Sequence, residues 1–170
     1  MEIKAEISES QIKDYIFRAV DDVFQTMLRC PVTLRGAIES WPPSSASTGA
    51  EPHVVGVVGF LGDMNGVIYL SFATSFATKC TGKMLGMSPP EVEAAGAEVV
   101  SDAIGELTNM IVGGFKNRLS DAGLPCKLTV PSVLRGTDIR VKPAGHAKQY
   151  LYLFDAAGQT IVADIMLAAD

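Results

Sequence analysis

The chain is 170 residues long, which suits one domain with a sizeable core, and we interpret residues 1–170 as a single domain. Hydrophobic residues make up 48% of the chain and charged residues 19%, a balance typical of a globular protein rather than a disordered one. The formal net charge of −5 disfavours nucleic acid and anionic membrane surfaces as partners, because both are bound through basic patches.

Other classes of protein are disfavoured by individual segments and residue types. The start, MEIKAEISES, lacks the apolar segment of a signal peptide, and no apolar run approaches the length of a membrane span. The cysteines Cys30, Cys80 and Cys126 are widely spaced and typical of reduced, buried thiols. With only two histidines, a metal site or a histidine-based triad is not expected. We therefore expect a cytoplasmic protein that holds no cofactor of its own.

The first half of the chain predicts a helix, a strand, a hairpin and a second helix. Apolar residues recur at helical spacing in 8–29, where Ser8 or Ser10 could form the N-cap. The segment 41–52 is rich in Pro, Ser and Gly and predicts a surface loop. The remaining elements are a strand from Pro31, a hairpin that turns at 62–66, and a helix over 75–85 closed by Gly86.

The second half predicts the same order again, beginning with a long helix. Pro89 and Pro90 are expected to open this helix at about residue 91, because proline is favoured at the first helical position. One strand is then expected over 127–139, followed by a hairpin that turns at 156–159.

A short internal repeat supports this order. PVTLRG at 31–36 recurs as PSVLRG at 131–136, and the two long helices align at an offset of 84 residues. We interpret the chain as a duplicated helix–strand–hairpin unit, with pseudo-repeats at roughly 8–86 and 90–170; chance similarity between two amphipathic helices is the alternative. Strands joined by hairpins pair antiparallel, so the expected fold class is α+β, an antiparallel sheet with long helices packed on it.

One face of the second long helix carries an unusual set of residues. Asp102, Glu106, Asn109 and Gly113 are spaced by four, three and four positions, so they lie along one line, which we call the polar strip. Glycine inside a helix costs about 0.5–1 kcal/mol relative to alanine. Gly105 and Gly113 adjoin the strip, and close approach by another backbone would account for both; packing of the helix on the sheet is the alternative.

A carboxylate and an amide one turn apart can perform a limited range of chemistry. Neither is a nucleophile activated by a neighbouring base. An amide can hold a water molecule, and in phosphoryl hydrolysis an Asn or Gln can orient the attacking water. A carboxylate beside it can pair with a cation on the molecule that presents the phosphate. Exposed Glu and Asn are usually solvated surface, and the flanking glycines and the spacing favour a functional role for Glu106 and Asn109.

The pattern D-x-x-x-E-x-x-N, here Asp102, Glu106 and Asn109, resembles the signature helix of the CheC/CheX/FliY family of chemotaxis phosphatases. The sequence GELTNMIVGG, the chain length and the single intact motif are most similar to the CheX branch. The resemblance implies a CheC-like fold and hydrolysis of the aspartyl-phosphate of a CheY-like response regulator, which would terminate the chemotaxis signal.

The resemblance also implies roles for individual residues. Asn109 would position water in line with the phosphorus, and Glu106 would contact the receiver's lysine. Asp102, Gly105 and Gly113 would lie against the partner. Mg²⁺ would be held by the phosphorylated receiver, and the chain would form a homodimer through its sheet edges. A receiver-binding or flagellar-switch adaptor without turnover is the alternative.

A degenerate copy of the polar strip is expected on the first helix. Asp22 and Gln25 occupy the positions of the carboxylate and the amide, but Arg18 and Arg29 replace the flanking acid and glycine. Two large cations would block close approach by a partner. The first copy is therefore expected to keep its place in the fold without the chemistry.

Overall fold

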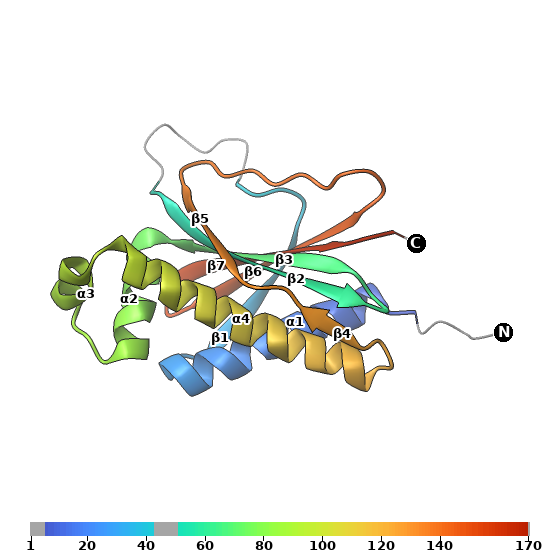
Figure 1. The fold of residues 1–170 in the computed structure, drawn as a ribbon, viewed down its shortest axis with the longest axis horizontal. Helices are drawn as coiled ribbons and strands as arrows, with labels where there is room; N and C mark the ends of the chain where they lie inside the picture. The colour runs from blue at the N-terminus through green and yellow to red at the C-terminus, as the bar shows by residue number, and fades with distance from the viewer. Residues whose placement is uncertain (1–5, 43–50, 170) are drawn as a thin grey trace.

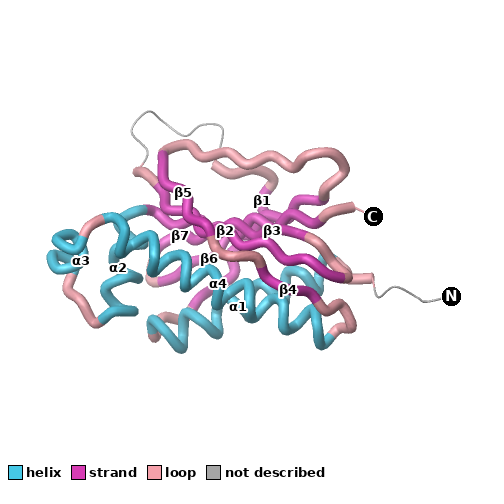
Figure 2. The backbone as a smooth tube through the Cα atoms, viewed as in Figure 1, coloured by secondary structure: helices cyan, strands magenta, loops and turns pink. Residues whose placement is uncertain are grey.

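The computed structural model of the protein describes residues 6–42 and 51–169. Its helices and strands are α1 Glu9–Leu28, β1 Val32–Ile38, β2 His53–Gly62, β3 Gly66–Ala73, α2 Thr74–Leu85, α3 Pro89–Ala95, α4 Ala97–Asp121, β4 Cys126–Leu128, β5 Ser132–Gly136, β6 Lys148–Ala156 and β7 Gln159–Leu167. An antiparallel sheet forms one layer, and the long helices α1 and α4 cover one of its faces (Figures 1 and 2). The predicted α+β architecture is confirmed.

The order of strands across the sheet is β1-β6-β7-β3-β2-β4, and β5 also pairs with β2. Both predicted hairpins, β2–β3 and β6–β7, are present. Strand β1 does not pair with the first hairpin but with β6 of the second, and β5 pairs with β2 of the first. The two halves of the chain therefore exchange their single strands. The pseudo-repeats 8–86 and 90–170 would account for this exchange, and the duplication itself stays an interpretation.

Helix α1 begins, and helix α2 ends, where the sequence predicts. Ser8 is the N-cap of α1: its hydroxyl accepts a hydrogen bond from the Gln11 amide at 3.2 Å, and Gln11 Oε1 accepts one from the Ser8 amide at 2.9 Å. This reciprocal pair satisfies two amide groups that the helix itself leaves without partners. Helix α2 ends at Gly86, whose φ of 67° is the left-handed conformation that glycine adopts readily.

The predicted start of the long helix is wrong. Pro89 and Pro90 open a separate short helix, α3, which Ser88 caps. The chain then turns at Gly96, with φ 96° and ψ 173°, and α4 begins at Ala97. A residue with a side chain rarely adopts that conformation, so Gly96 separates the two helices.

The single strand predicted over 127–139 is also wrong, because it is split into β4 and β5. Pro131 has no amide hydrogen to donate to a strand ladder. Thr129 instead joins β2 through two bonds to Gly59: its amide donates to the Gly59 carbonyl at 2.8 Å, and its hydroxyl accepts from the Gly59 amide at 2.9 Å. Most of the loop predicted at 41–52 lies outside the described residues.

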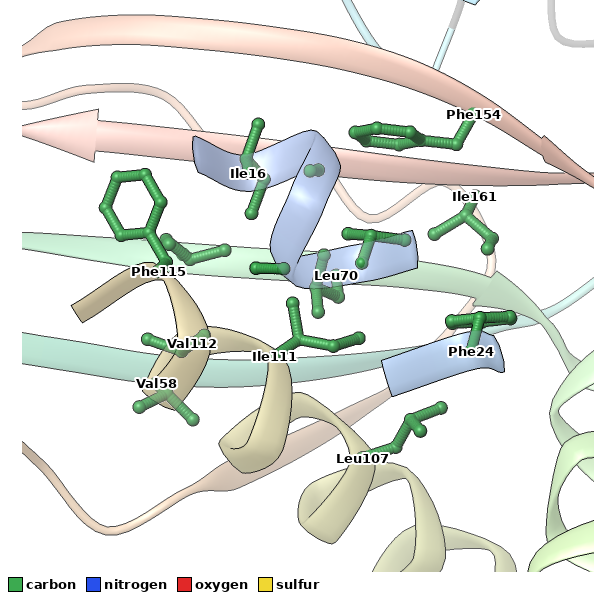
Figure 3. Packing of buried hydrophobic residues seen from close by; sticks show 14 of the residues in the cluster. Ile16, Phe24, Val58, Leu70, Leu107, Ile111, Val112, Phe115, Phe154 and Ile161 are labelled. Carbon is green, nitrogen blue, oxygen red and sulfur yellow. The ribbon is translucent and has the colours of Figure 1, made fainter. Parts of the chain in front are cut away.

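The core lies between the two long helices and the facing side of the sheet (Figure 3). Phe115 of α4 is fully buried, and its ring lies 6.5 Å from that of Tyr15 on α1 and 5.8 Å from that of Phe60 on β2. A Cβ built on Gly114 would lie 3.4 Å from Ala19 Cβ, so the missing side chain lets α4 pack closely on α1. Among the described helices, none combines the length and the apolar character needed to cross a membrane.

Candidate functional site

The polar strip lies on the solvent side of α4. Asp102 and Glu106 are exposed, and Asn109 and Gly113 are half-buried. The opposite side of the helix faces the core, where Ile104, Leu107, Ile111 and Phe115 are fully buried. The helical spacing that predicted the strip therefore places its members on one accessible line of a helix whose opposite side is packed in the core.

Strands β4 and β5 lie beside α4 (Figure 1). Gly105 is buried, and a Cβ built there would lie 3.4 Å from Val133 Cγ2 of β5. A Cβ built on Gly113 would lie 4.0 Å from Leu128 Cδ1 of β4, which leaves room around it. The segment nearest to Gly105 thus belongs to this chain, and a Cβ there would make an ordinary van der Waals contact with β5.

The polar side chains of the strip are not engaged within the described part of the chain. The hydrogen bonds that α4 side chains make there involve Ser101, Thr108 and Arg118, and none involves the strip. Thr108 Oγ1 donates to the Ile104 carbonyl at 2.7 Å and lies fully buried against the sheet. The carboxylates and the amide of the strip are therefore available to a partner.

The equivalent positions on α1 are engaged. Asp22 Oδ2 accepts a hydrogen bond from Arg118 of α4 at 2.6 Å, and Gln25 Nε2 donates to Asp21 Oδ2 at 2.8 Å. Arg18 pairs with Asp14 at 3.0 Å. Contacts within the chain thus hold the carboxylate and the amide of this copy. Sequence reasoning missed Arg118, because an ion pair between two helices leaves no local pattern.

The described residues contain no group of three or more His, Cys, Asp or Glu side chains placed to hold a metal ion. All three cysteines are buried, as predicted, and form no disulfide. Burial raises the pKa of the Cys80 thiol to about 12, so this group stays protonated at neutral pH.

A family model described as chemotaxis phosphatase CheX matches residues 54–155, a range that includes the whole polar strip. The chain belongs to the CheX family. The family predicted from the motif on α4 is therefore confirmed.

Individual relatives of the CheX family agree with this result. The CheY-P phosphatase CheX of Thermotoga maritima is 33% identical to the chain over 105 residues, which is 61% of this chain and 65% of the relative. The match thus spans less than two thirds of that relative's length.

Two solved structures of this kind share the fold. A CheC-like superfamily protein from Shewanella sp. PV-4 has a TM-score of 0.77 at 23% identity, over 95% of this chain and 100% of that one. The CheX–CheY–BeF3–Mg²⁺ complex from Borrelia burgdorferi contains a chain with a TM-score of 0.65 at 21% identity, over 93% of this chain and 98% of that one. At these identities they show that the fold is CheC-like, as predicted.

Proposed function

We propose that the protein hydrolyses the aspartyl-phosphate of a CheY-like receiver domain, with the polar strip of α4 as its active surface. The relative named CheY-P phosphatase and the complex that contains CheY support this class of partner. The observation that carries the proposal is the contrast between the helices. Glu106 and Asn109 face outward without a partner among the described residues, whereas Asp22 and Gln25 are held within the chain.

Asn109 is proposed to position the attacking water. Its amide can accept a hydrogen bond from water through the carbonyl oxygen and donate one through nitrogen, which fixes both the place and the orientation of the nucleophile. The receiver would supply Mg²⁺ and the phosphoryl group, so the charge on phosphorus would be neutralised outside this chain. The contribution of Asn109 is then orientation, which lowers the entropic part of the barrier.

Glu106 is proposed to pair with a lysine of the receiver. The carboxylate is exposed and one helical turn from Asn109, so a partner that reaches the amide also reaches the acid. Since Glu106 has no ion pair among the described residues, binding would not require one to be broken. Asp102 extends the negative charge along the same line and favours approach of a cationic surface.

Replacing Glu106 with glutamine should weaken binding of the phosphorylated receiver while largely preserving the rate at saturation. The substitution keeps size and hydrogen bonding and removes the charge that forms the ion pair. The measurement is the dephosphorylation rate against the concentration of phosphorylated receiver. A saturating rate that falls steeply with half-saturation unchanged would show that Glu106 acts in the chemical step instead.

The chain is further proposed to form a homodimer through the edge of β1. Strand β1 lies at one end of the sheet. It pairs with β6 on one side, and no described strand pairs with β1 on its other side. An edge of this kind readily pairs with another copy. The opposite edge carries β4 and β5 beside α4, so a dimer through β1 leaves the polar strip accessible. Sedimentation at micromolar concentration should give twice the chain mass of 18.0 kDa, and a monomer alone would contradict the dimer.

The experiment that tests the proposed function follows the decay of phosphorylated receiver domains with and without the protein. Faster decay at substoichiometric protein is the expected result, because a catalyst turns over. A stable complex with a receiver whose phosphate decays at its own rate would instead identify a binding module without turnover.

A further inference from the structure

The corner between β4 and β5, residues 129–131, presents a large apolar side chain to solvent. Val130 is 85% exposed, more than any other large hydrophobic side chain of the described residues. The next most exposed is Leu61 at 60%. A single exposed valine is common on protein surfaces, so its location decides whether it has a role.

Two contacts fix the location of this corner along α4. On one side of it, Leu128 is the nearest neighbour of a Cβ built on Gly113, at 4.0 Å. On the other side, Val133 is the nearest neighbour of a Cβ built on Gly105, at 3.4 Å. The corner therefore runs past the stretch of helix between these two glycines. That stretch contains the carboxylate and the amide proposed to act on the receiver, so the corner that carries Val130 passes beside the polar strip.

The corner is also held in place before any partner binds. Thr129 makes two hydrogen bonds to Gly59 of β2, at 2.8 and 2.9 Å. Pro131 restricts the backbone on the other side of Val130, because its ring fixes φ near −65°. An apolar side chain on a restrained backbone loses little conformational freedom on docking, which favours its use as a contact.

We infer that Val130 is a second docking contact for the receiver, buried on binding against an apolar side chain beside the receiver's phosphorylation site. The inference rests on the proposed function, since the receiver must cover the strip for its phosphate to reach Asn109. A domain seated on the strip also covers the corner that borders it. Burial of Val130 would then add affinity that does not depend on charge, next to the ionic contact of Glu106.

Replacing Val130 with serine tests this inference. Losing a buried valine contact should raise the receiver concentration for half-saturation about fivefold to tenfold, with the saturating rate unchanged. The change should persist at high salt, because an apolar contact is not screened. Val130→Ile should retain wild-type half-saturation. Leu134→Ser is the matched control: Leu134 is 43% exposed, and because it follows Val133 it lies on the face of β5 away from α4.

The outcomes separate this inference from the proposed function. If the wild type accelerates decay and Val130→Ser has unchanged half-saturation, the docking role is wrong and the phosphatase proposal stands. The docking role is also overturned if Val130→Ser lowers only the saturating rate. It is overturned as well if Leu134→Ser raises the half-saturation concentration as much as Val130→Ser does. If the wild type does not accelerate decay, the affinity for a receiver loaded with beryllofluoride is measured instead. Weaker binding by Val130→Ser than by the wild type supports the contact. Equal binding by the two proteins, or no detectable binding by the wild type, overturns it.

Discussion

Replacing Asn109 with alanine should slow the accelerated decay of the phosphorylated receiver by about 100-fold or more, because the group that positions water is lost. The side chain is half-buried on the outer side of α4, so the fold should be retained. Raising the receiver concentration should not restore the rate, in contrast to Glu106→Gln. The measurement is the decay rate at saturating receiver, and wild-type turnover by this variant would contradict the assignment of Asn109.

Gln25→Ala is the matched control for this experiment. It removes an amide from the aligned position of α1, where Gln25 donates to Asp21 rather than facing a partner. Phosphatase activity should be nearly unchanged. It is a cleaner control than Asp22→Ala, which would also remove the ion-pair partner of Arg118. A large loss of activity in Gln25→Ala would mean that the α1 copy is functional after all.

Replacing Phe115 with alanine should lower the free energy of unfolding by about 3–5 kcal/mol, the usual cost of removing a buried aromatic side chain. The ring is fully buried between α1 and the sheet and contacts both Tyr15 and Phe60. Its loss would leave a cavity where three elements meet. Equilibrium unfolding in denaturant measures the change.

Asn117→Ala provides the control for Phe115→Ala on the same helix. Asn117 is exposed, and exposed substitutions usually change stability by less than about 0.5 kcal/mol. If Phe115→Ala destabilised the protein no more than Asn117→Ala, the packing of α4 against both neighbours would be contradicted.

The parts of the fold that were predicted correctly depend on short-range patterns. The two hairpins follow from runs of residues that favour strands on either side of turn residues, and α1 follows from helical spacing and the Ser8 cap. The break at Gly96 was missed because Pro89 and Pro90 do begin a helix, and an isolated glycine within a helical pattern does not by itself show that the helix ends. The exchange of β1 and β5 between halves is a long-range pairing that local residues cannot reveal.

In the candidate site, too, the features set by local spacing were predicted and the long-range contacts were not. The polar strip was predictable because residues three and four apart share a face of any helix, whatever surrounds it. The neighbours of the strip were not. The contact of Gly105 with Val133 and the ion pair between Asp22 and Arg118 each join segments that are far apart in the sequence. Gly105 was predicted to face a partner, with helix–sheet packing as the alternative, and its nearest neighbour among the described residues is Val133 of β5.

The pairing of β1 with β6 has a consequence for how the protein is made. Arg35 of β1 bonds to Asp155 of β6, which is 120 residues further along the chain. Synthesis runs from the N-terminus, so β1 leaves the ribosome long before the strand that completes it exists. During that interval its backbone has no native strand partner, and an unpaired strand can associate with other nascent chains. The sheet can therefore be completed only after the C-terminal hairpin has been made.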